Sequence, residues 1–227
     1  MTRPKLPRAG PAPPKARRTN AQRSAQTRAV IIDAAIELLF SRGLSATTTV
    51  AVAARAQVSR GAMLHHFPTR VALLIAVAQH IVAQQREERR VRSREIGVGL
   101  ARYYAGADIN WEIQKQPGTI ALLEIMMGTR SDPELHKGFA PFVKQMNEMR
   151  GQAAALVASD LRVTDMPAVA SMLYLHQATL RGLAIHLLFS DDAQGVEDAR
   201  RLFTHYSHSF AEALMARAVE HDEASEQ

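Results

Sequence analysis

The 227-residue sequence contains no cysteine, which excludes a disulfide framework and any zinc or redox site built on thiolates. It also lacks an apolar run near the ~18 residues that a membrane-spanning helix needs. The longest such run, Val71–Ala78, is followed at once by Gln79 and His80. The Arg17–Arg18 pair precedes a polar stretch rather than an apolar one, so no export signal is visible. We therefore expect a soluble, cytoplasmic protein with no membrane partner.

Aromatic residues are also scarce, at 5% of the chain, whereas apolar residues make up 47% and alanine is abundant. This composition favours packed helices over sheet, and no alternating pattern typical of a strand extends beyond four residues. No acidic residue precedes Asp33, although eight basic residues do, and the rest of the chain has 20 basic and 22 acidic residues. A basic leader on a near-neutral body points to a polyanionic partner, with nucleic acid ahead of an anionic membrane.

The first half of the chain predicts four helices. Apolar residues recur at helical period from about Thr27 to Gly43, which suits a C-terminal cap. A short second helix follows, and the brief segment Gln57–Ser59 leaves room only for a tight turn before a third helix that ends at Phe67–Pro68. Thr69 then caps a long fourth helix. Two short helices joined by about three residues, just after a basic arm, are typical of a helix-turn-helix.

The remainder of the chain is predicted to be helical as well, so the fold class is all-α. An N-terminal helix-turn-helix DNA-binding domain is predicted to precede a larger helical domain. The later helices are expected over Leu100–Lys115, Pro117–Thr129, Pro133–Ser159, Pro167–Ser190 and Gly195–His221. The predicted divisions are a disordered, basic, proline-rich arm over 1–24, the DNA-binding domain over 25–74, the larger helical domain over 75–221 and a disordered tail over 222–227.

The segment Ala34–Leu74 combines several specific features: a Gly after the first helix, a Thr pair that opens the second, Val-Ser at the turn, and His-His-Phe-Pro at the end of the third. In this combination the segment resembles the DNA-binding domain of the tetracycline repressor (TetR) family, over about Thr27–Val77. Three positions depart from the family pattern. Gln57 stands where a turn Gly is usual, Leu64 where a Tyr is usual, and Val71 where a Glu is usual.

The resemblance implies a DNA-contacting surface on the second and third helices and the start of the fourth. Thr48 and Ser59 would donate hydroxyls to phosphates, while His66 and Arg70 would add charged contacts. The remaining implied positions on the third helix are Arg60, Gly61, Ala62, Leu64 and His65. Arg60 is the strongest candidate for base reading, because its planar fork matches guanine O6 and N7. Three arginines of the arm are expected at the minor groove or flanking phosphates, namely Arg17, Arg18 and Arg23.

The resemblance also implies that residues 75–221 form a helical effector-binding and dimerisation domain, the effector domain, whose last two helices pair with their copies in a homodimer. Apolar residues at alternating spacings of three and four predict a packing seam there, which packing within one chain would also explain. The predicted interface residues are Leu173, Leu180, Leu183, Leu187, Phe203, Tyr206 and Phe210. A small-molecule effector pocket is expected among the middle helices, where adaptable Met side chains suit apolar ligands. Its candidates are Tyr103, Tyr104, Trp111, Met126, Met127, Phe142, Met146, Met149, Met172 and His176, with Phe139, Glu124 and His186 beside them.

We therefore expect a dimeric, sequence-specific DNA-binding regulator, in the usual case a repressor, that a small apolar or amphipathic ligand releases from a palindromic operator. The fourth helix, which joins the two domains, is expected to carry the displacement. Its charged run, Gln84–Glu95, is interpreted as a solvated stretch with Glu88 and Arg92 paired.

Two alternatives belong to other classes. An all-helical enzyme would need a Glu-x-x-His pair, a Gly-rich phosphate loop or a cysteine nucleophile, and none is present. A sequence-indifferent architectural DNA-binding protein would have little use for the large, Met-rich C-terminal region. No metal or other cofactor is expected, because His65 and His66 are adjacent and point about 100° apart on a helix.

Overall fold

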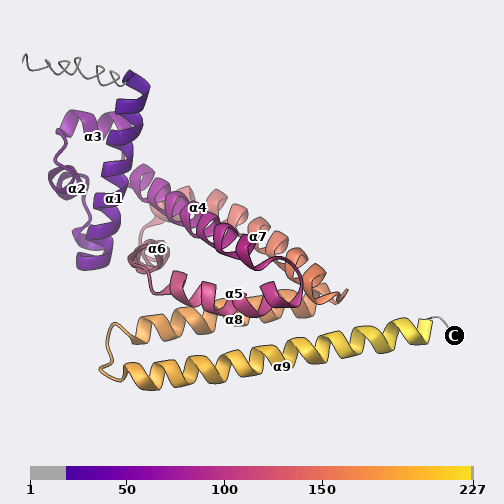
Figure 1. Ribbon diagram of the computed structural model, residues 1–227. Helices are drawn as coiled ribbons and strands as arrows, with labels where there is room; N and C mark the ends of the chain where they lie inside the picture. Colours follow the sequence, from indigo (N-terminus) through magenta and orange to yellow (C-terminus); the bar gives the residue numbers. More distant parts are fainter. Residues whose placement is uncertain (1–18, 226–227) are drawn as a thin grey trace, which may run out of the picture.

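The computed structural model describes residues 19–225, which form nine helices and no strand (Figure 1). The all-α prediction is confirmed. The helices are α1 (Asn20–Ala46), α2 (Thr49–Arg55), α3 (Arg60–His66), α4 (Arg70–Ile96), α5 (Leu100–Gln114), α6 (Pro117–Gly128), α7 (Pro133–Leu161), α8 (Met166–His186) and α9 (Ala193–Ser225).

Helix α1 begins earlier than the sequence predicted. Thr19 forms a capping box with Gln22, in which each side chain accepts a hydrogen bond from the other residue's backbone N–H. The helix therefore includes Arg23, which the prediction placed in the arm, whereas Arg17 and Arg18 lie outside the described residues. Helix α1 thus begins five residues before the start predicted for the DNA-binding domain at residue 25.

The end of α1 is marked by a break at Gly43. Its φ of 74° lies in the left-handed region, which glycine adopts without a Cβ clash. The sequence predicted a helix end at this glycine, and helical turns resume briefly up to Ala46. This break frees the N–H of Leu44 from the helical hydrogen-bond pattern.

The first hydrophobic core crosses the predicted domain boundary at residue 75. It joins α1, α2 and α3 to α4, α6 and the start of α7, and includes Leu38, Leu74, Ile125 and Phe139. Helix α1 packs more extensively against α6 than any other pair of helices pack together. The DNA-binding helices therefore share a core with part of the effector domain instead of forming a separate unit.

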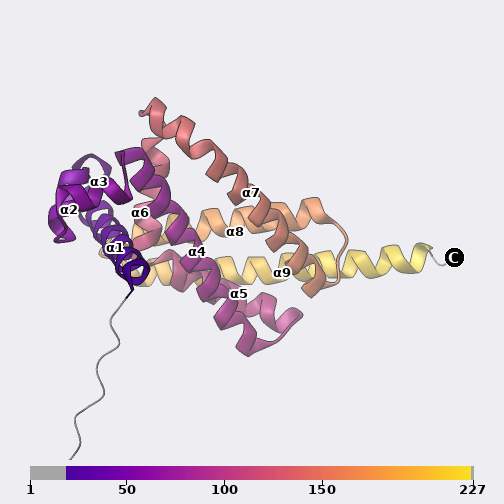
Figure 2. The same cartoon turned by 90° about the horizontal axis from the view of Figure 1, so that it is seen from above.

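Two further cores lie in the rest of the effector domain. One joins α5, α7, α8 and α9 around Tyr103, Leu161 and Met172, and the other gathers Trp111 and Leu180 with neighbouring side chains. Helices α8 and α9 run side by side along one edge of the molecule (Figures 1 and 2). This edge lies away from α2 and α3.

Within residues 19–225, no single helix is both long and apolar enough to cross a membrane. Only α3 and α4 taken together reach the necessary length and hydropathy, and they meet at an angle of 65°. The apolar side chains of α4, including Leu73, Leu74 and Val77, are buried in the first core.

Candidate nucleic-acid interface

Two hydroxyl side chains stand at the amino ends of α2 and α3, where phosphate contacts are predicted. Thr48 Oγ1 accepts a hydrogen bond from the N–H of Ala51 at 3.1 Å, and Ser59 Oγ accepts one from the N–H of Ala62 at 3.1 Å. Both side chains are exposed. Because a hydroxyl that accepts a hydrogen bond still has its own proton to donate, each can cap its helix and contact a phosphate together.

The outer face of α3 is open to a partner. Arg60 is exposed and makes no hydrogen bond or ion pair through its side chain with residues 19–225, while Met63 on the opposite face is buried in the core. A Cβ at Gly61 would meet nothing nearer than Ser59 Oγ at 3.9 Å, so the backbone here is accessible. The exposed residues of this helix are Arg60, Gly61, Leu64 and His65, and Ala62 and His66 are half-buried.

The turn between α2 and α3 is built around Gln57, which has a φ of 54°. This is the left-handed conformation that the family pattern gives to a glycine, and a non-glycine residue pays about 1 kcal/mol for it. The N–H of Val58 donates to the carbonyl of Ala53 at 3.0 Å, which closes the turn. The tight turn predicted from the sequence is therefore present, with Gln57 in the strained position.

His66 lies at the end of α3 in a partly desolvated position. Burial is the main cause that lowers the pKa of His66, and the charges of His65 and Arg28 lower it further. His66 is therefore mostly uncharged near neutral pH, so the contact predicted for it becomes a neutral N–H contact. Arg28 of α1, whose guanidinium lies 5.3 Å from the ring centroid of Phe67, brings a permanent charge to the same edge. No sequence pattern singled out Arg28, because its place depends on how α1 crosses α3.

Arg70, the first residue of α4, is held within the chain. Its Nε donates to the carbonyl of Thr47 at 2.9 Å, and Nη2 donates to the carbonyl of Leu44. Its Nη1 lies 3.9 Å from the carboxylate of Asp132, the residue that caps α7. The structure thus places Arg70 at the junction of the α1–α2 turn with α7, and the phosphate contact expected of it stays a prediction.

A second polar link joins the same turn to α6. Glu124 Oε2 accepts a hydrogen bond from the N–H of Leu44 at 2.9 Å in a partly buried setting. A Cβ at Gly43 would lie 3.3 Å from the same carboxylate oxygen, so the break in α1 also leaves room for this contact. Glu124, which the sequence placed beside the predicted effector pocket, thus connects α6 with the end of α1.

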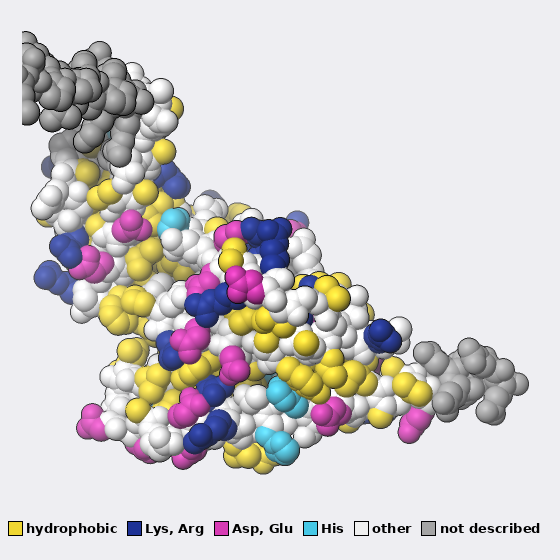
Figure 3. Space-filling model, viewed as in Figure 1, with side chains coloured by type: hydrophobic (Ala, Val, Ile, Leu, Met, Phe, Trp, Pro, Cys, Tyr) yellow, Lys and Arg dark blue, Asp and Glu magenta, His cyan; other side chains and the backbone are white. Residues whose placement is uncertain are grey.

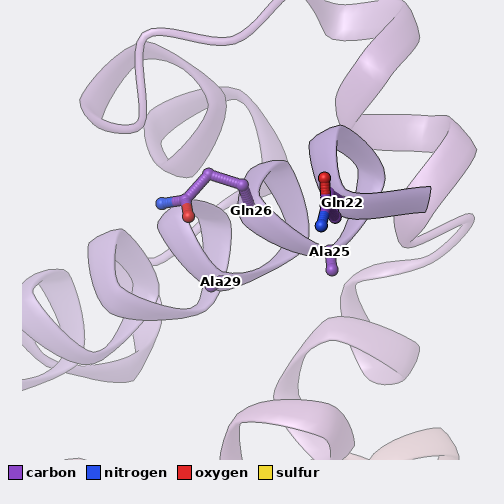
Figure 4. A pocket seen from close by; sticks show the side chains of 4 residues that line it. All are labelled: Gln22, Ala25, Gln26 and Ala29. Carbon is purple, nitrogen blue, oxygen red and sulfur yellow. The ribbon is translucent and has the colours of Figure 1, made fainter. Parts of the chain in front are cut away.

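A shallow hollow on the first part of α1 is lined by Gln22, Ala25, Gln26 and Ala29 (Figure 4). Their spacing places them on one face of the helix. The start of α1 lies on the same side of the molecule as α3 (Figure 1).

The model of the family described as bacterial regulatory proteins, tetR family, matches residues 31–77, the segment that contains α2, α3 and the adjoining parts of α1 and α4. Residues 31–77 therefore match the DNA-binding domain of the TetR family. Over 193 residues it is 28% identical to the HTH-type transcriptional regulator CymR of Pseudomonas putida, which covers 81% of this chain and 90% of that protein. The predicted role as a DNA-binding transcription regulator is thereby confirmed at the level of the family.

Solved structures share the fold at lower identity. A TetR-family regulator from Rhodococcus sp. is 19% identical, with a TM-score of 0.62 over 84% of this chain and 99% of that one. A transcriptional regulator from Saccharomonospora viridis, in complex with choline, is 16% identical, with a TM-score of 0.60 over 80% of this chain and 95% of that one. The likeness extends through both domains of the regulator.

The residues predicted to line one effector pocket are divided among several sites. Met126, Phe142 and Met146 belong with the first core, Tyr103, Tyr104 and Met172 with the second, and Trp111 with the third, while Met149 is half-buried and Met127 is 52% exposed. The prediction of a single pocket from all of them is therefore not met. Helical periodicity shows which side chains face inward, but it does not show which core they enter. A groove of about 450 Å³ lies elsewhere, between α1, α4 and the start of α6, and its lining includes Phe40, Ile81 and Gln116.

Several predicted pocket residues from α5 and α8 do meet, beside polar groups of α9. Ser207 Oγ lies 3.1 Å from the hydroxyl of Tyr103 and 2.8 Å from Nε2 of His176. Burial lowers the pKa of His176 to about 4, with the nearby His208 adding to the effect, and burial raises the pKa of Tyr103. The Nε2 atom of His208 is buried without a hydrogen-bond partner among the described residues. These side chains form a buried polar cluster that joins α5, α8 and α9.

The predicted dimer seam on α8 faces the inside of the protomer. Leu180 is 2% exposed, and Leu173, Leu183 and Leu187 pack against the second and third cores, as does Phe203 of α9. Tyr206 and Phe210 are exposed, as the prediction requires. Apolar residues line two faces of α8, of which the sequence pattern identified the one that carries the buried Leu180. The large apolar side chains exposed on α8, on α9 and in the turn between them are Met166, Tyr174, Leu175, Leu188, Phe189, Leu202, Tyr206, Phe210 and Val219.

Proposed function

We propose that the protein is a homodimeric, cytoplasmic repressor that binds a palindromic operator in double-stranded DNA and is released by a small-molecule effector. The observation that carries this proposal is the exposed Arg60 at the start of the short α3, whose side chain has no partner in the described chain. Its guanidinium is free to read guanine in the major groove. The hydroxyls of Thr48 and Ser59 would contact phosphates on either side and fix the position of α3.

A homodimer is supported by the apolar surface of α8 and α9. Leu175 is 61% exposed, Phe189 82% and Tyr206 62%, and hydrophobic side chains are visible over these helices in Figure 3. A patch of this kind on a soluble protein marks an association surface. Two copies are also what a palindrome needs, because two recognition helices must lie about 34–36 Å apart to reach successive turns of the major groove. The proposed interface on α8 therefore lies on the face that carries Leu175 and not on the face of the buried Leu180.

The dimer is tested by light scattering after size-exclusion chromatography. Leu175→Glu and Phe210→Glu would each place a charge in the interface and should yield monomers with weakened DNA binding. Val143→Glu, which alters an exposed apolar side chain of α7, is the matched control and should remain dimeric. Dimers in all three variants would remove α8 and α9 from the proposal.

An effector response is supported by the buried Tyr103–Ser207–His176 group and by the polar links at Arg70 and Glu124. The first could orient a ligand, and the second would connect a shift of α6 or α7 with the end of α1. The related structure with choline shows a small molecule bound to a protein of this fold. A ligand favours release if it binds more tightly to the dimer conformation that cannot bind DNA than to the one that can, typically by about 1–3 kcal/mol.

Selection from random duplexes at about 150 mM salt, where non-specific binding is weakened, tests sequence recognition. We expect recovery of a pseudo-palindrome and, for Arg60→Ala, relaxed preference at one symmetric pair of positions. Arg217→Ala on α9 removes the same charge far from α3 and should leave the preference unchanged. Binding without sequence preference would favour the architectural alternative, and absence of binding would contradict the proposed function.

A further inference from the structure

Two arginines of α4 reach neighbouring helices without meeting a carboxylate. Arg89 donates from Nε to Oδ1 of Asn110 on α5 at 2.8 Å, and Arg86 donates from Nη2 to Oε1 of Gln152 on α7 at 3.5 Å. Neither arginine forms an ion pair with any residue in the described part of the chain. The charged run Gln84–Glu95, interpreted from the sequence as solvated, therefore has two members directed at other helices of the effector domain.

The acidic side chains of the same run are engaged elsewhere. Glu87 pairs with Arg90, and Glu88 pairs with Arg92 at 2.6 Å. Glu88 also accepts a hydrogen bond from the amide of Gln116 at 2.7 Å. The half-buried Arg89 and the exposed Arg86 thus have amide oxygens as their hydrogen-bond partners among the described residues.

The guanidinium of Arg89 is fixed in direction while its two terminal nitrogens stay free. The side chain is half-buried, and neither Nη atom has a hydrogen-bond partner in residues 19–225. These atoms remain in contact with solvent, unlike Oε1 of Gln114, which is sealed and unpartnered one turn after Asn110 on α5. Burial lowers the pKa of Arg89 and the charge of Arg86 lowers it further, while the charge of Glu88 opposes them, so an anion placed here would add to the stabilisation of the charged guanidinium.

We propose that Arg89, with Arg86 beside it, binds the carboxylate of a small organic acid between α4, α5 and α7. A planar guanidinium donates two parallel hydrogen bonds to a carboxylate, and the bond from Nε to Asn110 holds the fork ready for them. The inference rests on the proposed effector response, because the site lies in the effector domain, and it names the chemical class of that effector.

The α7 side of this site offers apolar surface for the rest of such a ligand. Met149 lies one turn before Gln152 and is half-buried, and Met146, one turn earlier again, packs against the first core. Methionine side chains adapt to ligands of different shape. The site therefore fits an acid with a short hydrocarbon chain, whereas a bare inorganic anion would gain nothing from this surface.

Isothermal titration of the purified full-length protein with hexanoate tests the proposal, with hexanamide as the neutral analogue. We expect saturable binding of hexanoate and none of hexanamide. Arg89→Gln should weaken hexanoate binding by about tenfold or more, because it removes the hydrogen bonds to the charged group. Arg90→Gln removes an equal charge from the same helix at a surface ion pair and should bind as the wild type does. Arg89→Lys keeps the charge but not the fork, so its affinity should fall between the two.

Hexanoate binding that is absent from the wild type, or equal in wild type and Arg89→Gln, would overturn the proposal. Inorganic phosphate bound as tightly as hexanoate would also overturn it, since the ligand would then not be an organic acid. If Arg89→Gln does not fold, the hexanoate affinities of Arg89→Lys and Arg86→Gln are compared with that of the wild type instead. Release of the selected operator is measured separately: binding without release would uphold the carboxylate site and contradict its effector role.

Discussion

The contact between Glu124 and the N–H of Leu44 gives the most direct test of how α6 is joined to the DNA-binding helices. A hydrogen bond to a charged group contributes about 1.5–3 kcal/mol, and its loss would leave a partly buried N–H without a partner. We therefore expect Glu124→Ala to lower the free energy of unfolding by about 2 kcal/mol. Glu124→Gln keeps an oxygen acceptor and loses only the charge, so about 1 kcal/mol should be lost.

Urea unfolding followed by circular dichroism measures this loss. With a urea dependence of about 2 kcal/mol per molar, the Glu124→Ala midpoint should fall by about 1 M. Wild type and variants are compared at one protein concentration, because dimer association shifts the apparent stability. Glu148→Ala on the exposed face of α7 is the control and should move the midpoint little. Equal midpoints for Glu124→Ala and Glu148→Ala would refute the reasoning that this bond stabilises the junction.

Two other predictions concern the packing of α6 and the buried histidine. A Cβ at Gly128 would lie 2.0 Å from Cδ2 of Leu44, so Gly128→Ala should destabilise the folded protein by about 1–3 kcal/mol. A Cβ at Gly106 would enter open space, so Gly106→Ala should stabilise the folded protein by about 0.5–1 kcal/mol. Thermal unfolding that ranks the two alanine variants the other way would contradict the packing at α6. The pKa of His176 is about 4 in the folded protein, against an ordinary value of 6.5. Because the unfolded chain therefore binds the proton more readily, the free energy of unfolding falls as the pH drops from about 7 through 4, by about 3 kcal/mol in full. The loss should be smaller in His176→Gln, as measured by urea unfolding at pH 7 and pH 4, and identical pH dependence in the two proteins would show that His176 is not buried in this way.

The features that the sequence predicted best are those set by residues within one turn of each other. Thr48, Ser59 and Thr69 each cap the helix predicted for them, because capping depends only on the cap and the following three residues. The tight turn at Gln57 and the helix break at Gly43 are local in the same sense. These positions were enough to define the helix-turn-helix.

Features that depend on how helices cross were not predictable in the same way. The periodicity of α8 identified an apolar seam, but apolar residues occupy two faces of that helix and the sequence does not show which is covered by α5 and α9. Glu124 and Leu44 are 80 residues apart, and Arg89 meets Asn110 through a contact between two different helices. A charged residue in a polar run has no sequence signal that separates a solvated side chain from one that reaches a neighbouring helix.

The polar links revise the route by which an effector would act. The sequence favoured α4 as the carrier of displacement, because it joins the two domains. In the structure the end of α1 is tied to α6 through Glu124, and Arg70 ties the α1–α2 turn to the cap of α7. Helix α3 in turn is anchored to α1 and α2 through the buried Met63 and Phe67. A ligand that shifts α6 or α7 would therefore act on α1 directly, and α3 would follow because it shares the same core.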